Sequence, residues 1–329
     1  GVATATAGVI VGGITLTGLG LRMTEFVEFV SQGNVMLMLL FIAAVCLVLG
    51  LGVPTTANYV LVATLMAPIV VELGAQNGLI IPLIGVHLFV FYYGIMGDIT
   101  PPVGLATFAA AAISGEDAIQ TGIQGAIYAL RTVILPFIWI FNPQLLLIDI
   151  EGPFSLVLVI AASTLATLLF AAVTMNWFRV RSRWWETLLL GLAVIFLFRP
   201  DFFMDHFAPE YRDEPPTKIF DVARDLPDGG RVISVISGVT LEGDEKQKTV
   251  AVRLRDDAGA EGRKRLSDAG LVVVPLGEQL QISQVRFGTP AAKSGFEQGW
   301  DVKSVKVRTD RPSAHWFYLP ALLLMGVVW

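Results

Sequence analysis

At residues 50–58 the chain reads Gly50-Leu51-Gly52-Val53-Pro54-Thr55-Thr56-Ala57-Asn58, and this stretch separates two apolar runs, 34–50 and 59–73. A membrane-spanning helix needs about 20 apolar residues, so neither run is a comfortable span by itself. No polar loop lies between them. The pattern predicts a re-entrant hairpin over residues 34–73, built from two half-length helices that meet at a Gly/Pro tip. Irregular backbone at membrane depth is tolerated only where protein buries it or water lines it, so we expect the tip to lie in a cavity.

A second interruption divides the apolar run 79–113, where the sequence is Gly97-Asp98-Ile99-Thr100-Pro101-Pro102-Val103-Gly104. Proline lacks a backbone donor, and it disfavours the helical conformation of the residue before it. We therefore expect one broken helix over residues 79–114 with an unwound middle. Asp98 is the only ionisable residue of that middle, and a carboxylate at bilayer depth usually faces a cavity or a partner.

The composition excludes most other classes of protein. Of the 329 residues 54% are hydrophobic and 16% charged, whereas soluble domains carry about 25% charged residues. One cysteine and three separated histidines argue against a disulfide scaffold or a zinc cluster. The net charge of −5 offers no basic surface for nucleic acid. The sequence has no Ser-His-Asp pattern, P-loop or dinucleotide fingerprint, so we expect no enzyme.

The charge distribution divides the chain, because most charged residues follow residue 148. We expect an all-α polytopic membrane protein with a small, soluble, β-rich C-terminal domain. The chain begins and ends inside apolar runs, so we also expect it to be a piece of a longer membrane protein. The expected segments are a transport domain at 1–148 with a span at 1–21 and another at 123–141, two additional transmembrane helices within 153–199, the β-rich domain at 200–313, and the start of a further span at 314–329.

The orientation follows from the arginine-rich loop Arg179-Val180-Arg181-Ser182-Arg183, which tryptophans flank on both sides. Arginines in a short loop between spans mark the cytoplasmic side, and tryptophans mark the membrane interface. Counting spans from this loop, we expect residues 200–313 on the periplasmic side and the hairpin 34–73 to enter from that side.

The two interruptions are the candidate functional site. Unwound backbone exposes carbonyl groups that suit a small cation, and helix N-termini favour an anion. A proline kink without a ligand is the alternative for either interruption alone, and Asp98 at a water interface is the alternative for that residue. Two interruptions, one beside an acid, favour a site. The candidate ion ligands are Gly50, Gly52, Pro54, Thr55, Thr56, Asp98, Thr100 and Pro101, and the candidate substrate-binding residues are Thr55, Thr56, Asn58 and Pro102.

The motifs 50–57 and 98–106 resemble the large membrane subunit of TRAP (tripartite ATP-independent periplasmic) transporters, and 10–20, 87–94 and 141–143 are similar to the fused type. The resemblance covers about residues 1–148. It implies the second inverted repeat of an elevator-type transport domain, in which the hairpin tip and broken helix build a sodium site beside the substrate. The other repeat, with its own ion site, would lie in the missing N-terminal half of the same chain.

The resemblance also implies partners and a location. A periplasmic solute-binding protein would deliver a small organic acid, such as a C4-dicarboxylate or an oxoacid, to a permease in the bacterial inner membrane. Uptake would be coupled to sodium, with protons as the alternative ion and no other cofactor. From the residues themselves, an ATP-driven transporter is disfavoured because this sequence has no Walker motif, although a separate subunit could carry one.

Residues 280–302 look like the second half of a PDZ domain, although the usual carboxylate-binding loop is not evident. Three alternatives follow: a non-transporting membrane anchor with a periplasmic PDZ-like interaction module, a small β domain that only caps the membrane part, and a membrane-embedded enzyme. The remaining polar residues have structural explanations. We expect His87 to be a packed, hydrogen-bonded core histidine, Arg131 to snorkel or pair, and Cys46 to be a small buried hydrophobe.

Overall fold

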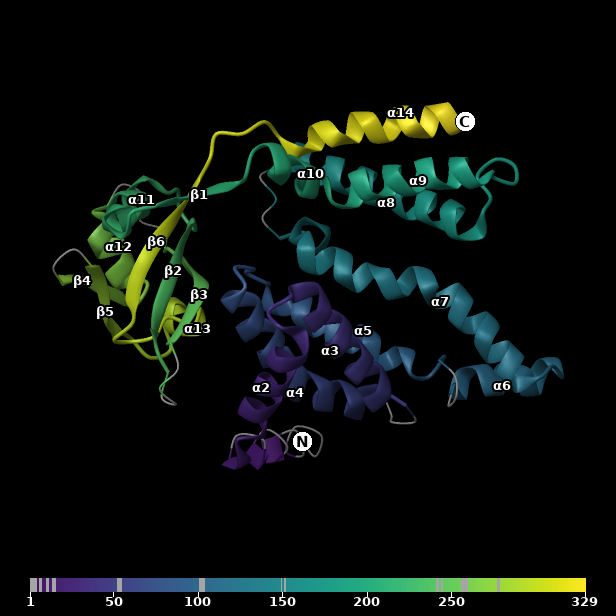
Figure 1. The fold of residues 1–329 in the computed structure, drawn as a ribbon, viewed down its shortest axis with the longest axis horizontal. Coiled ribbons are helices and arrows are strands. Elements are labelled where there is room, and N and C mark those ends of the chain that lie inside the picture. Colours follow the sequence, from purple (N-terminus) through teal and green to yellow (C-terminus); the bar gives the residue numbers. More distant parts are fainter. Residues whose placement is uncertain are drawn as a thin grey trace. The chain divides into compact units, whose positions relative to one another are not determined.

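The structure, a computed structural model, divides into two compact units, which are described separately below. The first comprises Gly1–Leu73, Ile81–Phe207 and Pro312–Trp329, and the second comprises Gly74–Ile80 and Ala208–Arg311. Figure 1 labels the helices and strands of both. The structure describes every residue except 1–4, 6–7, 10–11, 14–15, 52–54, 101–103, 149, 151, 241–242, 244, 256–259 and 277–278.

The segment predicted as a re-entrant hairpin contains two helices, α3 (Val35–Leu49) and α4 (Thr55–Gln76), and α2 (Leu19–Ser31) precedes them. The re-entrant path remains a prediction. Asn34 caps α3, since its Oδ1 accepts a hydrogen bond of 3.0 Å from the backbone N–H of Leu37. The second arm differs from the expectation of two half-length helices: α4 has 22 residues and is long and apolar enough to cross a membrane. The tip itself, 52–54, and ten of the 21 residues of the expected span 1–21 lie outside the described residues.

The predicted break separates α5 (Leu83–Met96) from α6 (Leu105–Ser114). Two backbone hydrogen bonds turn the chain there, from the N–H of Gly104 to the carbonyl of Thr100 (3.1 Å) and from the N–H of Ala106 to the carbonyl of Asp98 (3.0 Å). Gly104 has a φ of +41°, a left-handed conformation that glycine adopts without strain. The helices thus end at Met96 and begin again at Leu105, and the unwound middle between them remains a prediction.

The next helix, α7 (Ala118–Phe141), runs along both halves of the broken helix. Against α6, the position of a Cβ on Gly125 lies 2.9 Å from the methyl group of Thr107, so a larger residue there would require Thr107 to move. Against α5, the Phe137 ring lies with its centroid 5.4 Å from that of Phe89 and 5.8 Å from that of Tyr93. These contacts hold the two halves of the broken helix on one support.

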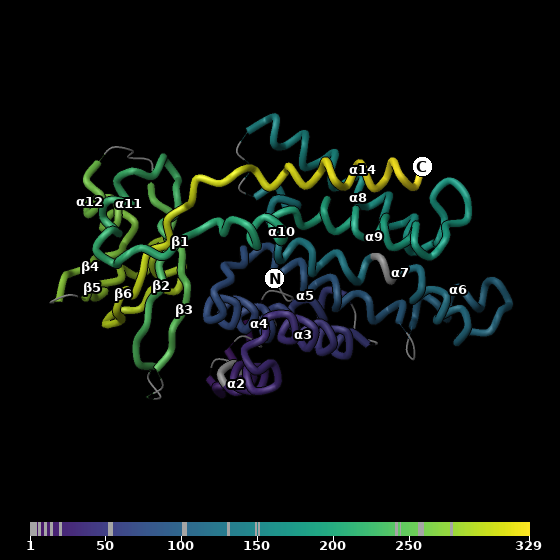
Figure 2. Tube along the Cα trace, turned by 45° about the horizontal axis from the view of Figure 1, so that its top comes forward, coloured from purple at the N-terminus to yellow at the C-terminus, as the bar shows by residue number. Residues whose placement is uncertain are grey.

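A second helical layer contains α8 (Pro153–Met175), α9 (Trp184–Phe198) and α14 (Tyr318–Val328). Figure 2 shows α9 and α14 side by side, although they are more than 100 residues apart in the chain. After α9 the chain bends by 78° into α10 (Pro200–Phe207). The β-rich unit therefore does not begin at residue 200, where the soluble domain was expected, but after α10, which belongs to the first unit. The buried core of this layer is Ile138, Ala162, Ala166, Leu169, Leu190, Ala193, Val194, Leu197, Phe198 and Ala321.

Among the described residues, three helices are long and apolar enough to cross a membrane by themselves, α4, α7 and α8, and the bent pair α9–α10 would add a fourth. Four further apolar helices are shorter: α3, α5, α6 and Ala314–Val328. The last of these includes the 3-10 turn Ala314–Phe317. A mostly helical membrane protein is therefore confirmed, whereas the elevator-type arrangement remains a prediction.

The second unit is built on an antiparallel sheet with the strand order β3-β2-β6-β5-β4, and β1 pairs with β6. The β-rich C-terminal region is therefore present, as expected. The strands are β1 (Tyr211–Glu214), β2 (Arg231–Val239), β3 (Glu245–Arg253), β4 (Leu271–Leu276), β5 (Gln279–Val285) and β6 (Asp301–Arg308), and the helices are α11 (Ile219–Asp225), α12 (Gly262–Asp268) and α13 (Pro290–Lys293).

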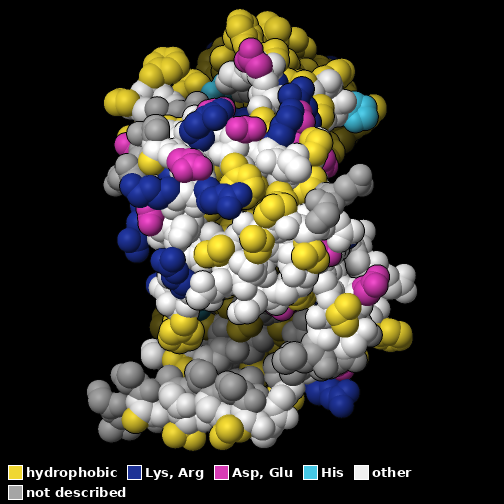
Figure 3. Space-filling view, turned by 90° about the vertical axis from the view of Figure 1, so that its left-hand side faces the viewer, with side chains coloured by type: hydrophobic (Ala, Val, Ile, Leu, Met, Phe, Trp, Pro, Cys, Tyr) yellow, Lys and Arg dark blue, Asp and Glu magenta, His cyan; other side chains and the backbone are white. Residues whose placement is uncertain are grey.

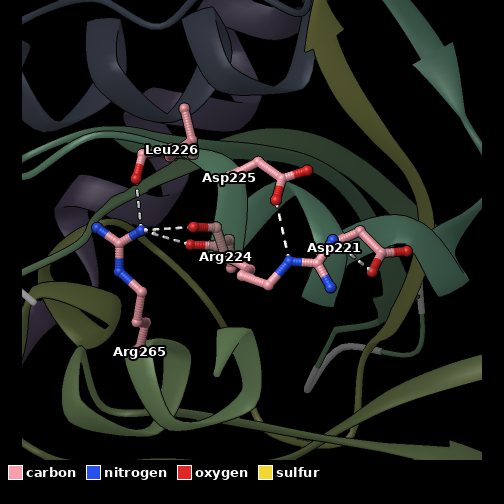
Figure 4. Close-up of polar contacts among 6 residues, drawn as sticks. Asp221, Arg224, Asp225, Leu226 and Arg265 are labelled. Carbon is pink, nitrogen blue, oxygen red and sulfur yellow. Dashed lines mark hydrogen bonds and ion pairs between the residues drawn. The ribbon is translucent and has the colours of Figure 1, made fainter. Parts of the chain in front are cut away.

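A buried arginine, Arg265 of α12, ties the helices of this unit together (Figure 4). Its side chain is 1% exposed, and its guanidinium donates hydrogen bonds to the carbonyls of Ala223 (2.7 Å), Leu226 (2.5 Å) and Pro227 (3.1 Å). These carbonyls lie at and just after the C-terminal end of α11. A helix C-terminus favours a cation, because its last carbonyls have no intrahelical donor and the helix dipole is negative there. Arg265 is therefore a structural cap on α11.

The surface of this unit mixes charges of both signs. In Figure 3 acidic and basic side chains are interspersed over its face. The two ends of the unit also run side by side, since the N–H of Thr309 donates to the carbonyl of Glu210 (2.9 Å) and Arg311 donates to the carbonyl of Ala208 (3.2 Å). The segment Ala208–Arg311 thus leaves and rejoins the chain through two paired stretches of backbone. Its assignment to the PDZ fold remains a prediction.

Candidate ion and substrate site

The two interruptions meet through glycine backbones. Gly50 ends α3, and Gly97 follows the last residue of α5. A Cβ atom added to Gly97 would lie 2.6 Å from the carbonyl carbon of Gly50 and 2.7 Å from its oxygen. Real Cβ atoms essentially never come so close to backbone atoms. The end of the first hairpin arm and the break of the broken helix are therefore in direct backbone contact.

A third glycine, Gly94, belongs to the same contact. A Cβ on Gly50 would overlap the carbonyl oxygen of Gly94, one turn of α5 before Gly97. Gly94 itself is tight, since a Cβ there would lie 2.7 Å from Nδ2 of Asn58. We call Gly50, Gly94, Gly97 and Asn58 the glycine junction. The close approach explains why the three glycine positions of the junction lack side chains.

Asn58 supplies the polar side chain of the junction. It lies in the first turns of α4, is 1% exposed, and places its amide against Gly50 and Gly94. Its Oδ1 is buried and has no hydrogen-bond partner among the described residues. Leaving such a group unsatisfied costs about 1–3 kcal/mol. The buried oxygen thus has an unused capacity to accept a hydrogen bond or to coordinate a cation.

The threonines predicted for the site are placed differently. Thr55 and Thr56 are exposed in the first turn of α4. Thr100 lies in the break, where its hydroxyl donates a hydrogen bond of 2.7 Å to the carbonyl of Met96. That hydroxyl still has acceptor capacity, because a threonine oxygen carries two lone pairs.

Asp98 is half-buried and directly follows Gly97, so it is adjacent to the junction in sequence and in space. Both of its backbone groups are hydrogen-bonded. The N–H of Asp98 donates to the carbonyl of Ile95 (3.3 Å), and the carbonyl of Asp98 accepts from the N–H of Ala106 (3.0 Å). The break therefore fixes the base of this side chain. The remaining predicted residues, Gly52, Pro54, Pro101 and Pro102, lie outside the described residues, and their roles remain predictions.

One pair of residues beside the junction had no functional role in the sequence interpretation. The hydroxyl of Tyr59 and Nδ1 of His87 lie 3.1 Å apart and share a hydrogen bond. His87 is thus a packed, hydrogen-bonded histidine, as expected, although it is half-buried rather than fully buried. Its partner could not be identified from the sequence because 28 residues separate the two. Cys46 is fully buried on α3, as expected.

The chemistry of the junction suits a hard cation. The candidate ligands are backbone carbonyl, amide and hydroxyl oxygens with one carboxylate, and hard cations prefer oxygen ligands. In the part of the chain that the structure describes, no group of three or more His, Cys, Asp and Glu residues could hold a metal ion. The helices α3, α5 and α6 carry no Asp, Glu, Lys or Arg, so Asp98 is the carboxylate nearest to the contact.

Comparison with known families divides the chain at α8. A family model described as "Tripartite ATP-independent periplasmic transporter, DctM component" matches residues 1–154, and one described as "Domain of unknown function (DUF3394)" matches residues 156–329. Comparison with curated proteins and with solved structures gives no match. The glycine junction lies inside the first matched region, and α8, α9, α14 and the sheet lie almost wholly inside the second. Residues 1–154 are therefore a DctM-type large-subunit domain of a TRAP transporter, and through residues 156–329 the chain belongs to the DUF3394 family.

Proposed function

We propose that this chain is the part of a TRAP permease that binds a sodium ion and a small organic acid at the glycine junction. The observation that carries the proposal is the buried, unpartnered Oδ1 of Asn58 at the contact between the two interruptions. A proline kink without a ligand does not require a buried polar group at the contact, and an apolar residue there would be less costly. A bound cation would supply the missing partner.

The proposed ion site combines neutral oxygens with one charge. The carbonyl of Gly50, Oδ1 of Asn58 and the carboxylate of Asp98 are the candidate ligands from the described residues, and the hydroxyl of Thr100 is a further one. A carboxylate within a membrane segment is costly when alone. A bound sodium ion would offset that cost, and the protein oxygens would replace the water molecules that the ion loses on binding. The ion would also join the hairpin to the broken helix, because its ligands come from both.

The proposed substrate site lies at the beginning of α4. The first N–H groups of a helix have no intrahelical acceptor, and the aligned peptide dipoles place partial positive charge there. Thr55 and Thr56 are exposed in this turn and would add hydroxyl donors for a carboxylate. Asn58, the third predicted substrate residue, is buried in the junction, so we propose that it acts on the ion rather than directly on the substrate.

Coupling follows from the shared helix. An ion that holds Asn58 fixes the first turn of α4, and the same turn would bind the anion. Each ligand would then increase the affinity for the other by the same factor, as thermodynamic linkage requires. The loaded domain would move across the membrane as one body, in an elevator-type motion, and release both ligands.

The proposed assembly includes parts outside this chain. A periplasmic solute-binding protein would deliver the organic acid, and the N-terminal half would supply the second repeat with its own ion site. The bacterial inner membrane is the proposed location, with the sheet domain on the periplasmic side. A C4-dicarboxylate or an oxoacid is the proposed substrate class.

The test is uptake by proteoliposomes that contain the intact transporter and its solute-binding protein. We expect uptake of a radiolabelled organic acid when a sodium gradient is imposed, and little uptake when potassium replaces sodium on both sides. A proton gradient alone serves as the comparison. Equal uptake with and without sodium would overturn sodium coupling, and no uptake with any organic acid offered would overturn the substrate class.

A further inference from the structure

Beside the glycine junction, Tyr59 of α4 makes two side-chain contacts with α5. Its hydroxyl shares the 3.1 Å hydrogen bond with Nδ1 of His87, and its ring meets that of Phe91 edge to face, with 5.4 Å between centroids and 89° between planes. His87 and Phe91 are four residues apart, so they lie on one face of α5. Gly94 continues the same face, three residues further on.

The contacts of α4 with this face form a continuous row. Asn58 lies against Gly94, Tyr59 against Phe91 and His87, and the position of a Cβ on Gly94 is 3.7 Å from a methyl group of Val62. The three preceding residues, 55–57, are exposed and therefore supply no such packing. The placement of Asn58 thus depends on the residues that follow it, and Tyr59 is the immediate neighbour.

The hydrogen bond adds direction to this packing. Apolar contacts are non-directional and would allow α4 to rotate or slide slightly along α5. The bond between the Tyr59 hydroxyl and His87 instead fixes both the depth and the rotation of the first turns of α4. A rotation that broke it would also move the amide of Asn58 away from Gly50 and Gly94.

We infer that Tyr59 and His87 are positioning residues, which hold Asn58 in the glycine junction and so set the sodium affinity of the site. This inference rests on the proposed function. It assigns no direct contact with the ion to either residue. Loss of the bond should therefore weaken sodium binding while the transport rate at saturating sodium is retained.

The experiment measures sodium binding to the intact transporter by titrating the ion and following the rise in unfolding temperature, with potassium as the reference salt. Ligand binding to the native state stabilises it by RT ln(1 + [L]/Kd), where [L] is the free ligand concentration, so the titration yields an apparent affinity. The variants Tyr59→Phe and His87→Phe each remove the hydrogen bond and keep an aromatic ring. We expect each to raise the half-saturating sodium concentration about three- to tenfold, as the loss of one hydrogen bond would.

Three comparisons separate positioning from a merely structural role. His87→Asn retains an acceptor near the place of Nδ1, so we expect sodium affinity close to that of the wild type. The double variant Tyr59→Phe/His87→Phe should be no weaker than either single variant, because both remove the same bond. The matched control is Tyr92→Phe. Tyr92 is also on α5, but its ring contacts Trp139, so removal of its hydroxyl should leave the sodium affinity unchanged.

The outcomes distinguish this inference from the proposed function. If the wild type shows no sodium-dependent stabilisation, the proposed sodium site fails. If the wild type responds and Tyr59→Phe and His87→Phe respond at the same sodium concentration, only the positioning role fails. A lower unfolding temperature in potassium for both variants, with unchanged sodium affinity, would also overturn the positioning role.

Discussion

The peptide of Gly50 lies against Gly97, so that a methyl group on Gly97 would come within 2.7 Å of the Gly50 carbonyl oxygen. The two residues are 47 positions apart and belong to different interruptions of the apolar sequence. Neither requires glycine for its backbone conformation, since both have helical dihedral angles, with φ of −76° and −55°. Glycine is needed at both positions because of the space available.

Gly97→Ala tests this contact directly. Alanine suits the backbone conformation of Gly97 and has the higher helix propensity, so only the overlap with Gly50 opposes it. Overpacking of this kind costs about 1–3 kcal/mol, and we expect sodium-driven uptake to fall roughly tenfold or more. The measurement is uptake by proteoliposomes at equal amounts of inserted protein.

The matched control for Gly97→Ala is Gly191→Ala in α9. A Cβ there would have no heavy atom within 4 Å, so this variant should insert and transport as the wild type does. If Gly97→Ala transports at the rate of Gly191→Ala, the two interruptions do not pack as described.

The variant Asn58→Leu tests whether Asn58 binds the ion or is only a buried polar residue with a structural role. Leucine is similar in size but has no polar atoms, so it removes an unpartnered buried oxygen and should not lower stability in potassium. We expect the unfolding temperature in potassium to stay equal or rise, and the additional stabilisation by sodium to shrink. A sodium effect as large as that of the wild type would argue that Asn58 does not bind the ion.

Asp98→Asn removes the charge of the break and keeps its shape. Because the carboxylate would offset the charge of the ion, we expect a higher sodium concentration for half-maximal uptake, with normal membrane insertion. The control is Glu116→Gln, an exposed acid after α6. An unchanged sodium dependence for Asp98→Asn would place this carboxylate at the water interface instead.

Arg265→Met should destabilise the sheet unit. The methionine keeps the apolar part of the side chain but leaves the carbonyls of Ala223, Leu226 and Pro227 without their donor. Hydrogen bonds to charged groups contribute about 1.5–3 kcal/mol each, so we expect a loss of at least about 3 kcal/mol. Hydrogen exchange at 219–228 measures it, with the exposed Arg255→Met as the control. Equal protection in both variants would contradict a capping role for Arg265.

The orientation of the sheet unit can be tested by cysteine labelling. The single native cysteine, Cys46, is fully buried, so Cys46→Ser provides a background without reactive thiols. In that background Phe287→Cys is fully exposed on the sheet unit, and Val180→Cys is exposed in the arginine loop. We expect a membrane-impermeant reagent outside intact spheroplasts to label the first variant alone. Labelling of Val180→Cys alone would show that the orientation is the opposite of the one proposed.

The sequence was sufficient to locate both interruptions because glycine and proline act locally on the backbone. The break at 97–104 and the start of α3 at Asn34 follow from such local effects. The length of α4 was underestimated, because Thr55–Ala57 and Gly74–Gln76 are polar or small and do not extend an apolar run. Helix propagation nevertheless continues through them, since each added residue gains a backbone hydrogen bond.

Contacts between distant segments could not be predicted in the same way. The pattern indicated that Gly50 and Asp98 belong to one site, but not that Gly94 and Gly97 would form the contact. The Tyr59–His87 bond depends on the relative rotation of α4 and α5, which no local pattern determines. The helix α10, which belongs to the first unit, was assigned to the soluble domain because Pro200, Asp201 and Asp205 look like the beginning of a polar segment.

The central claim is that the glycine junction holds one sodium ion, and equilibrium binding of radioactive sodium to the intact transporter tests it most directly. The measurement compares the number of bound ions per chain in the wild type, Gly97→Ala and Gly191→Ala. We expect Gly97→Ala to bind one ion fewer than the wild type at saturation, and Gly191→Ala to bind the same number. Equal stoichiometry in all three would contradict the claim.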